Sequence, residues 1–185
     1  MNNSDRLKTL MESGRTVFTP QDLRMFWRAI PLNAKMSAVR MTQKGLLTRL
    51  ASGYYALNDR YNRYELANRL LAPSYVSFQA ALFHEGINFQ AREEIGSVAL
   101  RDHRKEVGRM IYSYAAMKKD LFFDPEGIVT REGVAMAVPE RAVLDSFYFG
   151  YLPDIDQAEK LNKTYLAKLS LKYPKTVRRK AEALL

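Results

Sequence analysis

The chain has 185 residues, of which 47% are hydrophobic, 11% aromatic and 26% charged, so it has apolar material for one ordinary domain or two small ones and is not expected to be disordered. It contains no cysteine, which excludes disulfides, zinc sites with thiolate ligands and cysteine nucleophiles. The formal net charge is +9, and the excess lies at the two ends: 10 Lys/Arg against 4 Asp/Glu in residues 1–60 and 8 against 3 in residues 156–185, compared with 11 against 13 between them. Basic segments favour a polyanion such as nucleic acid, although solubility alone would also account for them.

The N-terminus and the apolar runs indicate a compartment. The first ten residues, MNNSDRLKTL, lack the apolar core of a signal peptide, and the longest uncharged run, residues 70–83, is too short and too polar to span a bilayer. We therefore expect a cytoplasmic protein.

Two helices are predicted before residue 30. Ser4 can cap the first, which runs to about Ser13, and Gly14 ends it. Thr19 and Pro20 suit the cap and the first turn of the second. Helical spacing turns these side chains toward a core: Leu7, Leu10, Met11, Leu23, Phe26 and Trp27.

A third helix is predicted from Asn33 to Lys44, and Gly45 occupies the position where a helix ends in the left-handed conformation. The two segments that follow, residues 46–51 and 54–57, have the pattern of short strands joined by a Ser-Gly turn. The helix has one narrow apolar face and an opposite face that we expect to be polar and basic. The apolar face comprises Ala34, Ala38 and Met41.

This order of elements is that of a winged helix-turn-helix, in which the third helix enters the DNA major groove and the hairpin follows the neighbouring backbone. We expect residues 1–60 to form such a domain. Arg40 and Gln43 have the donors to read base edges, and four other side chains suit phosphate contacts: Lys35, Ser37, Lys44 and Arg49. The alternative is a small basic domain that packs against protein, with its charges only solvated.

Residues 61–185 are predicted to form a mixed α/β domain with basic C-terminal helices, so the fold class of the whole chain is α+β. Strands are expected at residues 95–100 and 110–115, and a hairpin within residues 128–138 around Glu132-Gly133. Five helices are expected. The first spans residues 64–71, and the second starts at Ser74 or Ser77 and has Val76, Ala80 and Phe83 pointing inward. The third runs from Pro139 to about Phe149, the fourth follows a cap at Asp154 or Asp156, and the fifth follows Pro174.

No catalytic motif is found in this second part: there is no phosphate-binding glycine loop and no nucleophile elbow. His84, near a helix end, and His103, in a charged loop, lack partners at metal-ligand spacing. We expect no catalytic residue, no metal and no cofactor. A nucleic-acid-processing enzyme remains an alternative, with a site among seven carboxylates: Glu93, Glu94, Asp102, Glu106, Asp120, Asp124 and Glu126.

In the segment AVPERAVLD, local helix structure is enough to explain the charged residues, so no functional role is needed for them. Glu140, just inside a helix start, gains about 0.3–1 kcal/mol from the helix dipole. Arg141 and Asp145 have the i, i+4 spacing of an ion pair.

Three stretches of the chain, taken together, resemble a known family. They are FTPQDL with GLLTRLASGYYAL, then SYVSFQAALFHEGI, then AMAVPERAVLDSFYFG. With them the chain resembles the AbiEi-type antitoxins of bacterial abortive-infection (type IV) toxin–antitoxin systems and the transcriptional regulators grouped with those. The matching residues in the last two stretches are Tyr75, Ser77, Ala80, Ala81, Leu82, Gly86, Ala137, Pro139, Glu140, Arg141, Ala142, Leu144 and Asp145.

The resemblance implies a DNA-binding antitoxin that represses its own operon by binding promoter repeats through the winged helix. It also implies a C-terminal domain that counters a nucleotidyltransferase-type toxin without a stable complex. A stand-alone winged-helix regulator is one alternative. Another is a protein-interaction module whose basic tail, residues 160–180, meets an acidic partner, and that tail could equally extend the DNA footprint.

Overall fold

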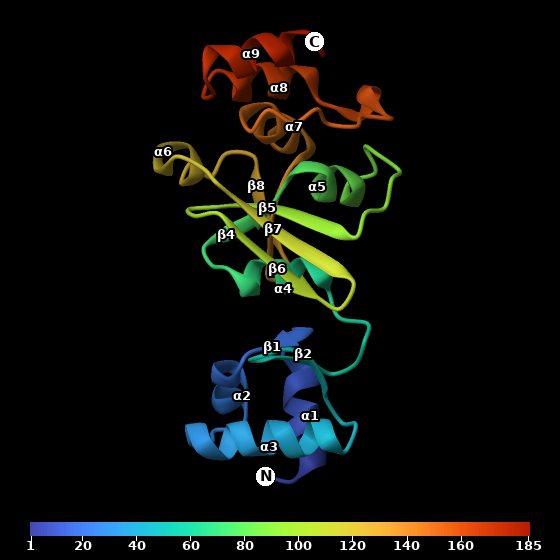
Figure 1. Cartoon of the computed structure of the whole chain (residues 1–185), viewed down its shortest axis with the longest axis vertical. Coiled ribbons are helices and arrows are strands. Elements are labelled where there is room, and N and C mark those ends of the chain that lie inside the picture. Colours follow the sequence, from blue (N-terminus) through green and yellow to red (C-terminus); the bar gives the residue numbers. More distant parts are fainter. The chain divides into compact units, whose positions relative to one another are not determined.

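We describe a computed structural model of residues 1–185, in which the chain is mixed α+β and divides into two compact units (Figure 1). Unit 1 is Met1–Leu66 and unit 2 is Ala67–Leu185. Each unit has its own sheet. No helix combines the length and the apolar character that a membrane crossing needs.

Unit 1 contains three helices and a three-stranded antiparallel sheet of order β1-β3-β2. Its elements are α1 (Asn3–Glu12), β1 (Val17–Phe18), α2 (Pro20–Phe26), α3 (Pro31–Gln43), β2 (Thr48–Ala51) and β3 (Tyr54–Ala56). The caps follow from local chemistry. Thr19 caps α2, as predicted, and Asp22 completes a capping box with it. At α1 the cap is Asn2, in a capping box with Asp5, and not Ser4. Helix α3 begins at Pro31, before the expected Asn33, because proline is well suited to a first helical turn.

Side chains from all three helices and from the hairpin fill the core of unit 1. Met11, expected in this core, is 67% exposed, because one step beyond Leu10 turns a helical side chain by about 100° away from the buried face. At the end of the unit the carboxylate of Glu65 accepts hydrogen bonds from the backbone N–H and the hydroxyl of Thr16. The core residues are Leu10, Phe18, Leu23, Trp27, Ala34, Ala38, Met41, Leu47 and Tyr55.

Unit 2 is built on a six-stranded mixed sheet of order β6-β7-β5-β4-β9-β8. Helices α5 and α7 lie side by side on one face, and α8 and α9 pack on α7 (Figure 1). The strands are β4 (Ser74–Val76), β5 (Glu94–Ala99), β6 (His103–Val107), β7 (Met110–Ala116), β8 (Ile128–Arg131) and β9 (Val134–Ala137). The helices are α4 (Arg63–Leu70), which begins in unit 1, α5 (Phe78–His84), α6 (Lys119–Phe122), α7 (Pro139–Tyr148), the 3-10 turn η1 (Ala158–Lys160), α8 (Lys163–Ser170) and α9 (Lys175–Glu182).

The hairpin β8–β9 confirms its sequence signal. Its two turn residues, Glu132 and Gly133, have φ of 50° and 78°, the left-handed pair that a tight hairpin turn requires. Helix α7 likewise begins at Pro139 as expected, and α9 begins directly after Pro174.

Several expectations for unit 2 are wrong. The charged segment that contains His103 is the edge strand β6 and not a loop; charged side chains are common on edge strands, where they discourage pairing with other chains. Residues 74–76 form strand β4, so a helix start at Ser74 is wrong, whereas the alternative start at Ser77 is confirmed, since Ser77 is the N-cap of α5. Phe83, expected to point inward, is 40% exposed. Helix α8 is capped by Asn162 and not by Asp154 or Asp156.

Candidate functional site

Helix α3 of unit 1 carries most of the residues expected to contact DNA. Ala34, Ala38 and Met41 are almost completely buried, as predicted. On the remaining surface the expected contact residues are exposed: Lys35, Arg40, Gln43 and Lys44 on the helix and its cap, and Arg49 on β2. They therefore lie on one helix and the strand that follows it.

Ser37 is an exception, and its expected placement on the exposed face is wrong. Its side chain is only 8% exposed. It lies three residues after Ala34 and four before Met41, so helical geometry turns it toward the core with them. A hydroxyl in that position does not reach a phosphate outside the helix.

The outermost ridge of α3 is apolar, which sequence reasoning missed. Leu32, Met36 and Val39 are 64%, 43% and 41% exposed. With the exposed Gln43 they follow the i, i+4, i+7, i+11 spacing of a single helix face. The signal was present in the same periodicity, because this ridge lies opposite Ala34 and Ala38.

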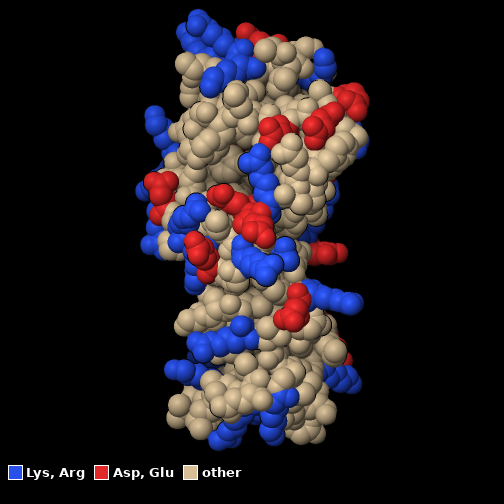
Figure 2. All heavy atoms as spheres, turned by 45° about the vertical axis from the view of Figure 1, so that its right-hand side comes forward, with Lys and Arg blue, Asp and Glu red and all other residues tan.

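The charge around this ridge has one sign. Residues 23–58 contain no Asp or Glu. None of the exposed cations Lys35, Arg40, Lys44 and Arg49 makes an ion pair, and on the face of unit 1 drawn in Figure 2 Lys and Arg outnumber Asp and Glu. The cations of this segment are Arg24, Arg28, Lys35, Arg40, Lys44 and Arg49.

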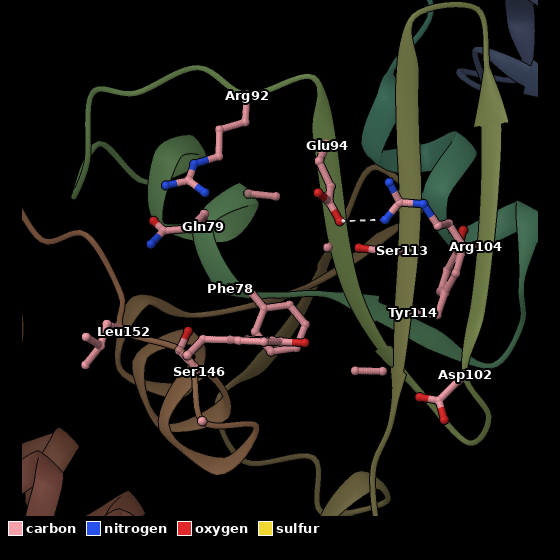
Figure 3. A pocket seen from close by; sticks show the side chains of 15 residues that line it. Phe78, Gln79, Arg92, Glu94, Asp102, Arg104, Ser113, Tyr114, Ser146 and Leu152 are labelled. Atoms are coloured by element: carbon pink, nitrogen blue, oxygen red, sulfur yellow. Dashed lines mark ion pairs between the residues drawn. The ribbon is translucent and has the colours of Figure 1, made fainter.

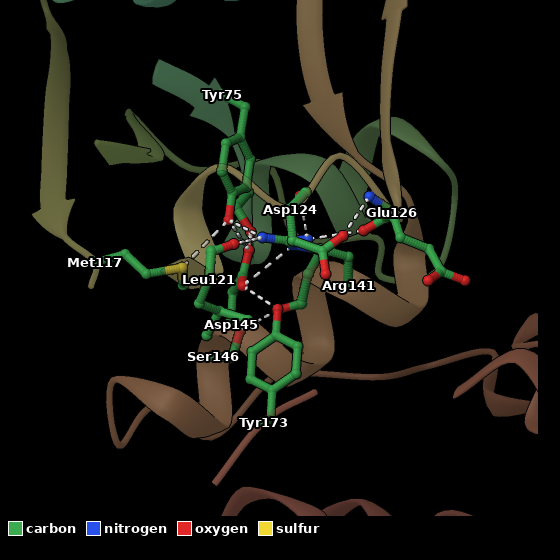
Figure 4. Close-up of polar contacts among 11 residues, drawn as sticks. Tyr75, Met117, Leu121, Asp124, Glu126, Arg141, Asp145, Ser146 and Tyr173 are labelled. Carbon is green, nitrogen blue, oxygen red and sulfur yellow. Dashed lines mark hydrogen bonds and ion pairs between the residues drawn. The ribbon is translucent and has the colours of Figure 1, made fainter. Parts of the chain in front are cut away.

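In unit 2 the motif residues of the family resemblance meet in a buried polar network (Figure 4). The carboxylate of Asp145 accepts hydrogen bonds from the hydroxyls of Tyr173 at 2.6 Å, Ser77 at 2.7 Å and Tyr75 at 3.1 Å. Asp145 and Ser77 are 0% exposed, and neither tyrosine exceeds 4%. Burial raises the pKa of Asp145, and the charge of Arg141 with these three O–H donors opposes part of that effect.

Arg141 forms the second half of the network and is itself 0% exposed. Its guanidinium lies 3.8 Å from Asp145, so the expected i, i+4 pair exists, although inside the protein and not on its surface. The same group donates to the backbone carbonyls of Leu121, Asp124 and Glu126. Arg141 thereby fastens the segment between α6 and β8 to helix α7.

Glu140 is also buried, at 6% exposed, and its carboxylate accepts a 2.7 Å hydrogen bond from the backbone N–H of Asn162, the cap of α8. The segment that contains Glu140, Arg141 and Asp145 thus joins five parts of unit 2: strand β4, the start of α5, helix α6 with the segment after it, the start of α8 and the segment after α8. These residues are withdrawn from solvent, so their arrangement explains the motif as a structural clamp.

A pocket of about 700 Å³ opens on the sheet face of unit 2 near the start of α5 (Figure 3). Its lining includes the small residues Gly96, Ser113 and Ala115. Phe78 forms part of the wall, with φ of 54°, and a Cβ at Gly96 would lie 2.8 Å from its ring. The charged lining is balanced, with two cations and two carboxylates: Arg92, Arg104, Glu94 and Asp102.

The carboxylates of the second part do not converge. No three His, Cys, Asp or Glu side chains lie close enough together to hold a metal ion. Two of them contact a cation or the backbone: Glu94 lies 3.9 Å from Arg104, and Asp102 accepts a hydrogen bond from the backbone N–H of Ala116. Asp124 and Glu126 pair with Lys172.

In comparisons with known proteins, no protein-family model and no curated protein matches the chain.

Proposed function

We propose that the chain is a sequence-specific DNA-binding protein whose unit 1 acts as a winged helix-turn-helix. The observation that carries the proposal is the surface of α3 and β2, where exposed cations without ion pairs stand in a segment that has no acidic residue. The order helix, strand, helix, helix, hairpin supports it, because this is the arrangement of winged-helix modules.

The roles of the residues follow from their places on α3. Gln43 ends the outermost ridge and Arg40 lies beside it, so these two meet base edges. Lys35 lies on the other side of the ridge from Arg40, and Lys44 and Arg49 lie further around the surface. These three contact phosphates, which position the protein without specifying sequence. Ser37 has no role in this contact because it is buried.

A titration of labelled duplex DNA tests this proposal. The full chain is added to a duplex from the region upstream of its own gene and to a scrambled duplex, followed by fluorescence anisotropy at several salt concentrations. We expect Arg40→Ala to weaken binding to the upstream duplex by about 1–3 kcal/mol and to reduce the preference over the scrambled one. The matched control is Arg131→Ala, which removes an exposed cation from β8 in unit 2. Failure of the wild-type chain to bind any duplex at low salt would overturn the proposal.

We further propose that the protein is an antitoxin of the AbiEi type, which represses its operon and counters a nucleotidyltransferase toxin. The resemblance supports this, and the convergence of the motif residues Tyr75, Ser77, Arg141 and Asp145 in one buried network gives them a shared structural reason. A stand-alone regulator would share the same DNA-binding unit.

Growth assays distinguish an antitoxin from a stand-alone regulator. The chain is expressed with the toxin candidate, a nucleotidyltransferase reading frame adjacent to its gene. We expect the wild type to restore growth, and Arg40→Ala to restore growth while losing repression of a reporter. If the wild type repressed the reporter but did not restore growth, the protein would be a stand-alone regulator.

A further inference from the structure

The starting observation is that the outermost side chains of α3 are apolar where a surface helix is normally polar. Leu32, Met36 and Val39 are each at least 41% exposed, and none of them belongs to the core of unit 1. An amphipathic helix keeps its charged side chains opposite its buried stripe. In α3 that opposite position is held by the three apolar residues and Gln43.

Cations stand on both flanks of this ridge. At about 100° per residue, Lys35 lies roughly 70° to one side of the ridge and Arg40 roughly 70° to the other. Lys44 follows Arg40 on the same flank. The helix therefore presents an apolar centre line between two positively charged margins.

This cross-section matches what a major groove offers. The groove is about 12 Å wide and admits one helix, whose outermost ridge faces the base edges while its flanks face the phosphate walls. From its flank, the long side chain of Arg40 reaches the base edges at the border of the ridge, as proposed above. Among the groups exposed on the floor of the groove, the C5-methyl of thymine is the apolar one. Apolar side chains at the ridge are therefore complementary to thymine and to no other base.

We propose that Leu32, Met36 and Val39 read thymine methyl groups, so that the base pairs under α3 in the DNA site are mainly A·T. This inference rests on the proposed DNA-binding function and specifies which sequences that function selects.

A second copy of the chain is a poorer occupant of the same ridge. Two ridges packed together would bring Lys35 and Arg40 of both copies side by side, and residues 23–58 supply no carboxylate to compensate. A stable protein interface also buries about 800 Å² per partner, which is more than three side chains supply. In duplex DNA, by contrast, thymine methyl groups can contact the apolar ridge while the phosphates neutralise the cations on both sides of it.

The test removes only the methyl groups. A randomised duplex library is first selected with the full chain, and the selected duplex is then synthesised with uracil in place of thymine, either under the contacted centre or in the flanking sequence. We expect uracil at the centre to lower affinity by about fourfold for each methyl group lost, from the free energy of about 0.8 kcal/mol per buried carbon. Uracil in the flanks should change nothing.

Variants of the ridge complete the design. The double variant Met36→Gln, Val39→Asn keeps side chains of similar length at exposed positions, so it should fold as the wild type does. It should lose most of the discrimination between thymine and uracil and keep only the part that Leu32 supplies. Circular dichroism checks the folding. Equal affinity for thymine and uracil duplexes, with salt-dependent binding intact, would overturn the inference and leave the DNA-binding function standing. If the chain bound no duplex at all, both the inference and the proposed DNA-binding function would be wrong. If the wild type formed dimers in analytical ultracentrifugation and the double variant were monomeric, the ridge would instead contact a second copy of the chain.

Discussion

The hydroxyl of Ser77 donates a 2.7 Å hydrogen bond to the carboxylate of Asp145, although 68 residues separate the two in the chain. Ser77 precedes α5 and Asp145 lies inside α7, so this bond joins the two helices that lie side by side on the sheet of unit 2. Because both side chains are completely buried, the bond forms where water does not compete for either group.

Removing one hydroxyl of the network should destabilise unit 2 measurably. Tyr173→Phe deletes the 2.6 Å hydrogen bond to Asp145, and a buried polar group that loses its hydrogen-bond partner costs about 1–3 kcal/mol. We expect a loss of that size in the free energy of unfolding, measured by urea titration with far-UV circular dichroism, since the single tryptophan, Trp27, reports on unit 1. Tyr148→Phe is the control, because its half-buried ring makes no comparable bond, and its effect should stay within about 0.5 kcal/mol. Equal effects of the two variants would contradict the role of the network.

Acid should weaken the attachment of α8 to the segment before β8. Burial opposes ionisation of Asp124, but the hydrogen bonds from Lys172 and from the backbone N–H of Glu126, together with the charges of Lys172 and Arg141, outweigh it and lower the pKa of Asp124 from 3.8. Hydrogen bonds from Lys172 and Lys168 lower the pKa of Glu126 from 4.5. Folded carboxylates with lowered pKa values bind fewer protons than unfolded ones, so their stabilising effect is complete above these ordinary values and disappears as the pH falls through the lowered ones.

Lys172→Met tests this pH dependence. We expect the variant to be less stable than the wild type at neutral pH and the difference to shrink as the pH falls below 4.5 and then below 3.8, the ordinary pKa values of Glu126 and Asp124. Urea titrations across this range measure it. A difference that does not change with pH would show that Lys172 acts through packing.

The contact between Gly96 and Phe78 should tolerate no added methyl group. A Cβ on Gly96 would lie 2.8 Å from the ring of Phe78, whose backbone is held at φ of 54°. We expect Gly96→Ala to cost about 1–3 kcal/mol of stability, as overpacking does. In a Phe78→Gly background the same substitution should cost clearly less stability. Urea titrations of the wild type, the two single variants and the double variant give the coupling energy between the two positions. Additive effects would show that the ring can move aside.

Lys44, the C-cap of α3, and Ser37, inside that helix, should respond differently in DNA binding. Lys44→Ala should weaken binding to all duplexes alike and reduce the salt slope by about 1, the effect of one lost phosphate contact. Ser37→Ala should leave the affinity unchanged, because the side chain is only 8% exposed. Anisotropy titrations over a range of salt concentrations measure both, and a loss of affinity in Ser37→Ala would mean that α3 turns differently from its placement here.

Sequence alone determined the features of this protein that depend on a few neighbouring residues. The cap at Thr19, the start of α7 at Pro139 and the left-handed turns at Gly45 and Gly133 were predictable, because they follow from local backbone geometry and from donors within the same turn. The buried stripe of α3 was predictable for the same reason.

Only the tertiary structure decided which polar groups are buried and which distant segments supply their hydrogen-bond partners. Arg141 and Asp145 have the spacing of a surface pair, yet both are buried, because the hydroxyls and carbonyls that surround them come from segments up to 70 residues away. The strand β6 has no apolar alternation, and pairing with β7 is what makes it a strand. Local propensity does not encode such partners, since burial and pairing depend on surfaces that exist only once the chain has folded.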